Sequence, residues 1–261
     1  MDENRTMENI SSQAQFDRQA ALYATSAVHR HGASLPVLIE YAAVRPGEVA
    51  LDVATGTGNT AIALSAAGAE VTGLDVSPKM LKMAEGRAAE EGQTIRFVEG
   101  SAESIPFEDA TFDLVTARHA PHHFRDVAKF LAEVVRVLKP GGRFVMSDGI
   151  SPTEESKPWF DRWQTLRDRS HWTNRTVEEW RGLAAEAGFT WTQDTIVPYR
   201  LEFPWWTNQS GCAPETIDEL IDHAREASPS IREAVGLEMD ENATPIAFHE
   251  PMLVVRMEKY K

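Results

Sequence analysis

Three histidines occur within five positions, at residues 119, 122 and 123, directly after a short run of strand-forming residues. An imidazole can take up a proton near neutral pH, so His119 and His123 are candidate catalytic bases. Their spacing from the end of the run ranks them above His122. A metal site is disfavoured, because no nearby carboxylate or thiolate completes an obvious ligand set. The remaining alternative is that the three rings only build the loop.

A second candidate is a turn of small residues between a hydrophobic strand and a helix. Residues 51–60 have the sequence LDVATGTGNT. Small residues there let the backbone approach a ligand, and the amides at the helix start are free to donate hydrogen bonds. In doubly wound folds, ligands bind beyond the carboxyl ends of the strands, where this turn would lie. A turn without a ligand also favours glycine, so the turn alone is a weak indication of a binding site.

The next predicted strand ends at Asp75, about twenty residues after the turn, where an acidic side chain can accept both hydroxyls of a ribose. The alternative is a solvated loop aspartate. Turn and aspartate together predict an adenosine-containing ligand, either a nicotinamide dinucleotide or S-adenosylmethionine. The spacing Gly56-x-Gly58-x-x-Ala61 fits a pyrophosphate at a helix N-terminus, so an NAD(P)-dependent oxidoreductase is one alternative.

Three further segments carry a family resemblance: residues 100–107 (GSAESIPF), 112–115 (FDLV) and 137–144 (VLKPGGRF). With the turn before them, they resemble in content and order the class I S-adenosylmethionine-dependent methyltransferases. Within that family the chain is most similar to the small-molecule branch that contains the ubiquinone/menaquinone biosynthesis C-methyltransferases. The resemblance covers about residues 45–150. It implies methyl transfer to a small organic acceptor, with carbon or oxygen favoured over nitrogen and S-adenosylhomocysteine as product.

The resemblance also implies which residues bind the cofactor. The small-residue turn would wrap the methionine part, with an acidic side chain orienting it from beneath. The second strand end would bind the ribose and lie against the adenine, and the segment after the third strand would contact the adenine amino edge. The end of the fourth strand would face the methionyl group. In chain order these residues are Asp52, Ala54, Thr55, Gly56, Gly58, Asp75, Val76, Met80, Ser101, Ala102, Glu103 and Arg118.

Two of these positions depart from the family pattern. Ala54 replaces the commonest first glycine of the turn, although the quinone-methylating branch tolerates an Ala-Thr-Gly string there. Ser101 stands where an aspartate commonly contacts the adenine amine, so this contact would involve a neutral hydroxyl and be weaker. Neither departure removes the predicted site.

Alternating strands and helices must position these groups. Strands are predicted at 49–54, 69–75, 95–99, 112–117, 143–148, 189–199 and 252–257, and helices at 59–67, 77–91, 126–138 and 176–187. We expect an α/β fold with a doubly wound, Rossmann-like sheet of seven mostly parallel strands, the last antiparallel. Ser77 and Pro78 predict a helix start, and Lys139-Pro140-Gly141-Gly142 predicts a helix end with a left-handed glycine cap.

Three stretches fall outside this alternation, at 1–35, 151–174 and 204–245, and we expect them to form a helical cap within a single domain spanning 1–261. The first resembles the lid helix of many relatives, with Tyr23 as a third catalytic candidate. The Trp, Phe and Tyr residues of the other two would suit an aromatic or apolar acceptor and could surround the sulfonium by cation–π attraction. The alternative is that these rings form the cap's own core.

Composition limits the partners of the chain. Its 261 residues include 26 Lys and Arg against 40 Asp and Glu, a net charge of −14, which disfavours nucleic acid and anionic lipid as partners. The single cysteine, Cys212, allows no internal disulfide. No segment approaches the roughly 20 apolar residues of a membrane span, and the N-terminus is polar. We expect a cytoplasmic monomer or homodimer acting on a small molecule. A catalytically idle relative that binds the cofactor as a regulatory partner is the other alternative.

Overall fold

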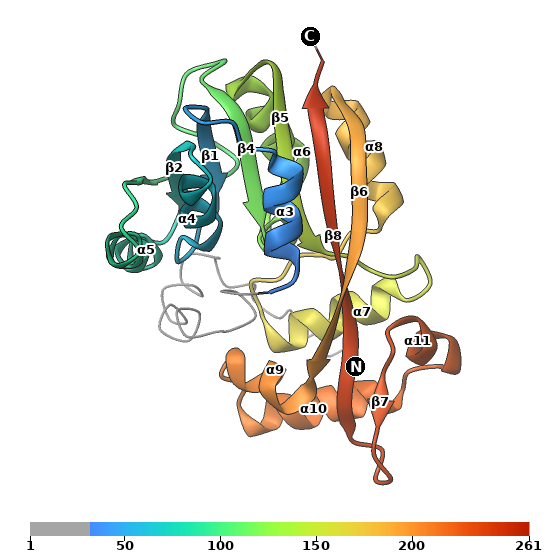
Figure 1. Ribbon diagram of the computed structural model, residues 1–261. Helices are drawn as coiled ribbons and strands as arrows, with labels where there is room; N and C mark the ends of the chain where they lie inside the picture. The colour runs from blue at the N-terminus through green and yellow to red at the C-terminus, as the bar shows by residue number, and fades with distance from the viewer. Residues whose placement is uncertain (1–31, 261) are drawn as a thin grey trace.

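One eight-stranded sheet runs through the part of the chain that the computed structural model describes, residues 32–260 (Figure 1). The strands are β1 (Val49–Val53), β2 (Glu70–Asp75), β3 (Arg96–Glu99), β4 (Phe112–Arg118), β5 (Leu138–Gly149), β6 (Phe189–Glu202), β7 (Glu238–Met239) and β8 (Pro245–Lys259). Their order is β3-β2-β1-β4-β5-β8-β6, and β7 pairs with β8. The first five are parallel, and β8 is antiparallel to both of its long neighbours. The predicted fold is confirmed, with the two-residue β7 added.

Helices cover both faces of the sheet. The helices packed on it are α3 (Ser34–Ala42), α4 (Asn59–Ala66), α5 (Pro78–Glu90), α6 (Val127–Val137) and α8 (Val177–Ala187), and the short 3-10 helix η1 (Pro121–His123) follows β4. One core cluster joins α6 and α8 to the sheet, and another joins α3 and α4 to it. The strands between them are buried on both sides because each face has its own layer of helices.

Local sequence signals account for several helix ends. The Ser77 hydroxyl accepts a hydrogen bond from the Met80 amide at 3.2 Å, with Pro78 in the first turn, so the predicted start of α5 is confirmed. The α8 helix ends at Ala187, where the predicted helix ends, and Gly188 after it is left-handed. The predicted glycine cap of α6 is wrong, because α6 ends at Val137 and Leu138 is already extended. Leu138 pairs with Phe112 of β4, so strand pairing begins before the glycines are reached.

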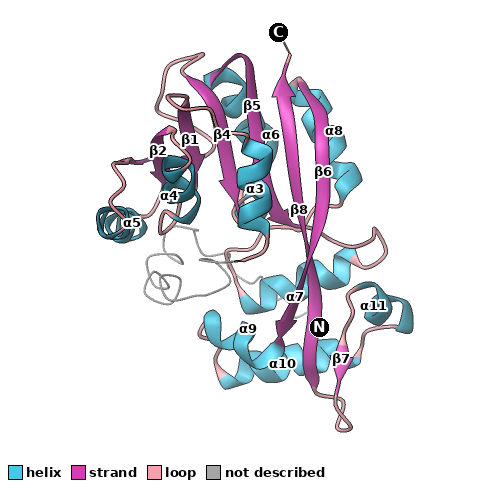
Figure 2. Cartoon of the chain, in the orientation of Figure 1, coloured by secondary structure: helices cyan, strands magenta, loops and turns pink. Residues whose placement is uncertain are grey.

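A separate group of helices lies beyond one end of the sheet (Figure 2). It consists of α7 (Lys157–Arg167), α9 (Phe203–Gln209), α10 (Pro214–Arg225) and α11 (Pro229–Ala234), which we call the cap. The paired strands β6 and β8 are longer than predicted and continue from the sheet into the cap, from Phe189 opposite Lys259 to Glu202 opposite Ala247. A continuous two-stranded ribbon therefore ties the cap to the sheet.

The cap has its own aromatic core. The Trp163 ring stacks on Trp206 at 5.0 Å between centroids and on Trp159 at 5.3 Å. Phe203 and Phe248 pack against the same rings. The alternative that these aromatic residues form the core of the cap is confirmed for this cluster, because nearly all of their surface is buried among themselves.

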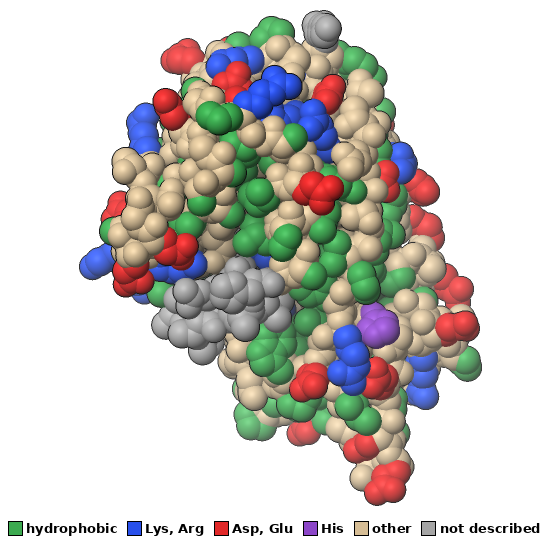
Figure 3. Space-filling view, in the orientation of Figure 1, with side chains coloured by type: hydrophobic (Ala, Val, Ile, Leu, Met, Phe, Trp, Pro, Cys, Tyr) green, Lys and Arg blue, Asp and Glu red, His purple; other side chains and the backbone are tan. Residues whose placement is uncertain are grey.

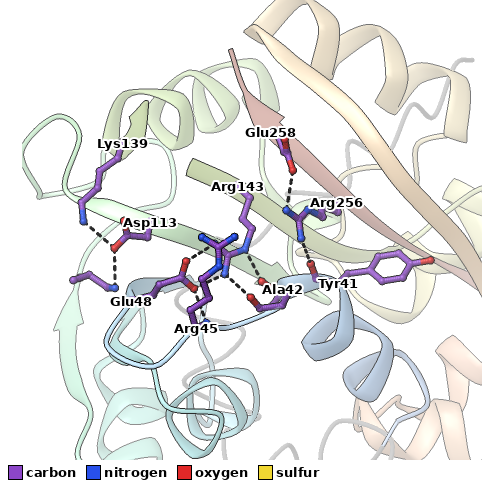
Figure 4. Close-up of polar contacts among 11 residues, drawn as sticks. Tyr41, Ala42, Arg45, Glu48, Asp113, Lys139, Arg143, Arg256 and Glu258 are labelled. Carbon is purple, nitrogen blue, oxygen red and sulfur yellow. Dashed lines mark hydrogen bonds and ion pairs between the residues drawn. The ribbon is translucent and has the colours of Figure 1, made fainter. Parts of the chain in front are cut away.

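The amino ends of the parallel strands are held by a buried ion pair (Figure 4). Arg143 of β5 donates to both carboxylate oxygens of Glu48, at 2.9 and 2.6 Å, and its guanidinium also donates to the carbonyls of Ala42 and Ala43. The Arg143 side chain thus fixes the end of α3 and the start of β1 to the middle of the sheet. The hydrogen bonds from Arg143 hold the pKa of Glu48 below its usual value, against the opposing effect of burial.

Two surface observations bear on partners. None of the helices found between residues 32 and 260 is both long and apolar enough to cross a membrane. On the face drawn in Figure 3, acidic and basic side chains are interspersed rather than gathered by sign. The expectation that the chain does not bind nucleic acid stays a prediction.

Candidate functional site

A cavity of about 390 Å³ opens at the carboxyl ends of β1, β2 and β4. Its size falls in the range of about 300–1,000 Å³ typical of small-molecule sites. The lining residues are Ala54, Thr55, Gly56, Thr57, Asn59, Thr60, Asp75, Val76, Met80, Gly100, Ser101, Ala102, Glu103, Arg118, His119, Ala120, His123, Phe124 and Arg125. We call it the nucleoside cavity. It contains every implied cofactor residue except Asp52 and Gly58.

The turn after β1 has a strained backbone. Ala54 and Gly56 both have φ of +54°, the left-handed region that favours glycine. Gly58 has φ of +83°, and a Cβ there would lie 3.1 Å from the Cβ of Ala84 in α5. Gly58 therefore allows α4 and α5 to pack closely, which explains why it lies outside the cavity. Ala54 keeps the left-handed conformation of the usual glycine at an energetic cost.

Asp52 lies beneath this turn. Its carboxylate accepts hydrogen bonds from the hydroxyls of Thr55 and Thr116, both at 2.7 Å. Burial raises the pKa of Asp52 to about 6, and the two hydroxyls act in the opposite direction. The side chain does not line the cavity, but through Thr55 it positions the turn that does.

Asp75 ties the turn to the end of β2. One carboxylate oxygen accepts the Gly56 amide at 2.7 Å, and the other accepts the Ser77 amide at 2.9 Å. Only 6% of the Asp75 surface is exposed, so the alternative of a solvated loop aspartate is wrong. A carboxylate oxygen has two lone pairs. An Asp75 oxygen that accepts a hydrogen bond from a backbone amide can therefore also accept one from a hydroxyl.

The remaining walls of the cavity come from three loops. Val76 and Met80 provide apolar surface, and the Ser101 hydroxyl accepts the Glu103 amide at 3.2 Å. Buried Arg118 donates from Nε to the Ser34 hydroxyl at 3.2 Å, and burial lowers the pKa of its guanidinium. The lining residues that were not predicted are Thr57, Asn59, Thr60, Gly100, Ala120, Phe124 and Arg125. Their position next to the predicted motifs was the signal that could have found them.

A second cavity, of about 60 Å³, adjoins the first between the sheet and the cap. Its lining residues are His119, His122, His123, Gln164, Arg167, Asp168, His171, Tyr199, Leu201, Trp205, Trp206, Glu250 and Met252. We call it the cap cavity. His119 and His123 line both cavities, so the two candidate bases stand where the cavities meet.

His119 has a strained backbone, with φ of +53°. Its Nε2 lies 3.4 Å from the Ser34 hydroxyl, and its ring meets Tyr199 edge to face at 6.0 Å between centroids. Tyr199 in turn accepts the Ser34 amide at 2.8 Å and donates to the Ser34 hydroxyl at 3.1 Å. The end of β4, the start of α3 and the β6 strand are thereby held together around this ring.

His122 forms an ion pair at the end of β5. Its Nδ1 lies 2.6 Å from a carboxylate oxygen of Asp148. Burial would lower the pKa of His122, but the charge and hydrogen bond of Asp148 outweigh it and the pKa is raised. The ring also stacks on His171 at 5.1 Å.

The surroundings of His123 shift its pKa in the opposite direction from that of His122. Its ring centroid lies 4.1 Å from that of His122, and its Nδ1 lies 3.1 Å from the Ser170 hydroxyl. Burial, together with the positive charge on His122, lowers the pKa of His123 to about 3. The His123 ring is therefore neutral at physiological pH, whereas Asp148 favours the charged form of His122.

The polar groups that surround the histidine rings were not predicted from the sequence. Asp148, Asp168, Ser170, His171 and Glu250 come from β5, the loop after α7, and β8. Nothing in their local sequence pattern marks them. Within residues 32–260, no group of three or more His, Cys, Asp or Glu side chains is arranged to hold a metal ion. Tyr23 lies outside the described residues.

Comparison with known proteins points to one family. Residues 51–146 match the family model described as a methyltransferase domain. The chain is 32% identical over 243 residues to the uncharacterized methyltransferase YcgJ of Bacillus subtilis, covering 92% of this chain and 95% of that protein. The YcgJ crystal structure, 31% identical, covers 88% of this chain and 100% of its own, with a TM-score of 0.83.

Two other relatives extend the comparison. A putative methyltransferase from Bacillus halodurans is 28% identical, with a TM-score of 0.84, over 88% of this chain and 100% of that one. A demethylmenaquinone methyltransferase from Thermus thermophilus is 45% identical over 104 residues, which is 39% of this chain and 47% of that protein. The similarity to a protein of named substrate is therefore local.

Proposed function

Because the chain belongs to the class I S-adenosylmethionine-dependent methyltransferases, we propose that it methylates a small organic acceptor bound where the nucleoside and cap cavities meet. Family membership overturns the oxidoreductase alternative that the Gly56-x-Gly58-x-x-Ala61 spacing left open. The observation that carries the proposal is the pair of adjoining cavities with His119 and His123 in both. One cavity has the place and size for the nucleoside, and the other lies under the cap.

The residues of the nucleoside cavity fit S-adenosylmethionine. Asp75 would accept the ribose hydroxyls, Val76 and Met80 would contact the adenine, and the turn at Ala54–Gly56 would hold the methionine part. Ser101, Ala102 and Glu103 would contact the adenine edge, and Arg118 would face the methionyl group. The buried carboxylate of Asp75 supports this assignment, since it stands at the strand end where ribose hydroxyls bind in related folds.

When bound, S-adenosylmethionine supplies a methyl group already activated by the positive charge on its sulfur. The protein then has to position the acceptor, exclude water and remove a proton where the acceptor carries one. The cap supports the first two tasks because Trp206 of its aromatic core lines the cap cavity together with the histidines. His119 and His123 are the groups available for the third.

We propose oxygen or an activated ring carbon as the methylated atom. Acceptors of both kinds carry a proton that must leave, and a buried imidazole would be the group that takes it up. The similarity to demethylmenaquinone methyltransferase supports the same class, because a quinol ring is activated at carbon by its hydroxyls. Trp205 and Trp206 line the cap cavity and would contact an aromatic acceptor.

Calorimetric titration with S-adenosylhomocysteine tests the cofactor half of this proposal. Asp75→Ala should weaken binding by about 1–3 kcal/mol, the usual cost of losing hydrogen bonds to a charged group. Asp113→Ala, at the opposite end of the sheet, is the matched control and should bind as the wild type does. Unchanged affinity in Asp75→Ala would remove this side chain from the ribose site.

Transfer of a labelled methyl group to a panel of phenols, hydroquinones and enolisable diketones tests the acceptor half. Product with any of them supports the proposal and identifies the methylated atom by mass spectrometry. Tight binding of S-adenosylhomocysteine with no labelled product from the panel or from cell extract would instead favour the idle, regulatory relative.

A further inference from the structure

The last residue of α7 brings a guanidinium group to the cap cavity. Arg167 is half-buried and lines that cavity together with Trp205 and Trp206. Its Nε donates to the backbone carbonyl of Trp206 at 3.0 Å, and its guanidinium carbon lies 4.9 Å from the centroid of the Trp206 ring. The hydrogen bond and the ring together fix the position of the guanidinium group.

The terminal nitrogens of Arg167 take no part in the hydrogen bond to Trp206. Within residues 32–260, neither Nη1 nor Nη2 forms a hydrogen bond or an ion pair. Most of the N–H donors of a guanidinium group are on these two nitrogens. A purely structural role, binding the backbone of α9, is fulfilled by Nε alone. The remaining donors are therefore available to a ligand in the cavity.

Two acidic side chains line the same cavity, but neither pairs with Arg167 in the part of the chain that the structure describes. Asp168 accepts the amide and the hydroxyl of Ser170 through Oδ1, at 2.8 and 2.7 Å. Burial raises the pKa of Glu250, against the opposing charges of His122 and Arg167, which favours its neutral form. A neutral carboxyl group can donate a hydrogen bond to an anion instead of repelling it.

We infer that Arg167 binds a carboxylate of the acceptor, so that the protein selects small organic acids as substrates. This inference rests on the proposed function and names the substrate class within it. The donors on Nη1 and Nη2 lie in one plane and match the two oxygens of a carboxylate, which can form two parallel hydrogen bonds with them. Arg167 is thus a specificity-determining residue and takes no part in the proton transfer.

The size of the cap cavity fits an end group of the acceptor and not a whole molecule. Its volume of about 60 Å³ holds a few water-sized groups. The rest of the acceptor would extend from Arg167 toward the junction with the nucleoside cavity, where His119 and His123 line both cavities. The carboxylate would therefore be bound at a distance from the methylated atom.

The charges at the cavity favour a carboxylate over a phosphate group. Burial alone would raise the pKa of Asp168, but neighbouring positive charge and the Ser170 hydrogen bonds lower it, so Asp168 is ionised. Arg167 supplies a single positive charge beside this carboxylate. A phosphate monoester carries close to two negative charges at neutral pH, and a singly charged carboxylate is repelled less.

Calorimetric titration of the protein saturated with S-adenosylhomocysteine tests the inference without any methyl transfer. The probes are benzoate, 4-hydroxybenzoate and butyrate, each compared with the amide of the same acid. We expect a carboxylate of this set to bind about 10- to 100-fold more tightly than its amide, the usual effect of hydrogen bonds between charged groups. Equal affinities of every acid and its amide, or no binding of any probe, would overturn the inference. Tighter binding of phenyl phosphate than of benzoate would overturn the choice of a carboxylate.

Variants of Arg167 test whether this side chain is the cation. Arg167→Gln should remove the preference for the acid over the amide and leave the affinity for S-adenosylhomocysteine unchanged. Arg167→Lys keeps the charge but loses the planar pair of donors, so it should retain part of the preference even if Arg167→Gln folds poorly. A preference that survives in full in Arg167→Gln would refute the role.

Arg162→Gln is the matched control. Arg162 is exposed on the same helix and lines neither the nucleoside cavity nor the cap cavity. The substitution changes the net charge by the same amount, so the preference for the acid should persist. An equal loss in Arg162→Gln and Arg167→Gln would mean that long-range charge and not contact causes the preference, and the role of Arg167 would be lost. Failure of the proposed function looks different, since the wild type would then transfer no methyl group while it still bound the acid more tightly than the amide.

Discussion

Strand β5 carries two buried ionic groups five residues apart, and their surroundings differ. At its amino half, Arg143 meets both oxygens of Glu48 and two backbone carbonyls, so the pair is enclosed by partners (Figure 4). At its carboxyl end, Asp148 meets His122, and the polar groups around them are incompletely paired. One end of the strand thus has the chemistry of a structural bond, and the other holds His122, which lines the cap cavity.

The incompletely paired groups gather where the cap meets the sheet. Within the described residues, three buried side chains in this region have polar atoms without a hydrogen-bond partner: Ser147 Oγ, the side-chain amide of Asn174 and Arg175 Nη1. Buried polar atoms are nearly always paired, so these exceptions distinguish the region around Asp148 from the fully paired Arg143 end. We therefore expect the Arg143 end to contribute more to the stability of the fold than the Asp148 end.

Arg143→Ala should have the largest effect on stability. It removes the donors from Glu48 and from the carbonyls of Ala42 and Ala43. Breaking a fully buried pair costs about 3–5 kcal/mol of unfolding free energy, and because Glu48 is only partly buried we expect a loss of about 3 kcal/mol. Urea unfolding followed by circular dichroism measures the loss. Arg200→Ala is the control, because Arg200 forms the same two-pronged pair with Glu238 on the surface, and water replaces exposed partners with little loss. Equal losses of stability in both variants would mean that burial does not distinguish the Arg143 pair from the surface pair.

Asp148→Asn should have an intermediate effect that depends on pH. The folded pKa of His122 lies above its usual value of 6.5, so the pair stabilises the fold below that value and the stabilisation is lost as pH rises through the folded pKa. We expect the variant to be less stable than the wild type by about 1–3 kcal/mol at pH 6, with the difference shrinking toward pH 9. Urea unfolding at several pH values measures it.

Asp113→Asn controls for the loss of a carboxylate. Its partner is Lys139, at 2.8 Å, which stays charged throughout this pH range. The stability difference between this variant and the wild type should therefore be constant from pH 6 to 9. A difference that is equally constant for Asp148→Asn would show that His122 does not carry the charge in the folded protein.

The smallest effect concerns the backbone at the site. Ala54→Gly relieves the strain of a left-handed alanine but adds chain entropy to the unfolded state, so we expect a gain of at most about 1 kcal/mol. Gly56→Ala is the reciprocal change at the same φ, and nothing lies within 4 Å of the added Cβ. It should destabilise by about 1 kcal/mol through backbone strain alone. Thermal unfolding measures the change in stability of both variants. If both were stabilised, or both destabilised, the backbone angle φ would not be the cause of the changes.

Much of the sheet and of the nucleoside cavity could be predicted because its signals are local. The run from Leu51 to Thr60 contains its own strand, turn and helix start, and Asp75 follows at the next strand end. The left-handed glycine cap of α6 was predicted wrongly because strand pairing of Leu138 with Phe112 is a non-local interaction. The lengths of β6 and β8 were underestimated for the same reason, because pairing with each other extends both strands.

The amino-acid sequence by itself determined the order of strands and helices, the family and the residues at each strand end, because hydrophobic period, turn residues and capping groups act over a few positions. Only the tertiary structure decided the surroundings of the three histidines after β4. Asp148, Asp168 and Ser170 come from segments 26 to 47 residues away from the imidazoles that they contact, and a contact of that kind exists only after the sheet and the cap have packed together.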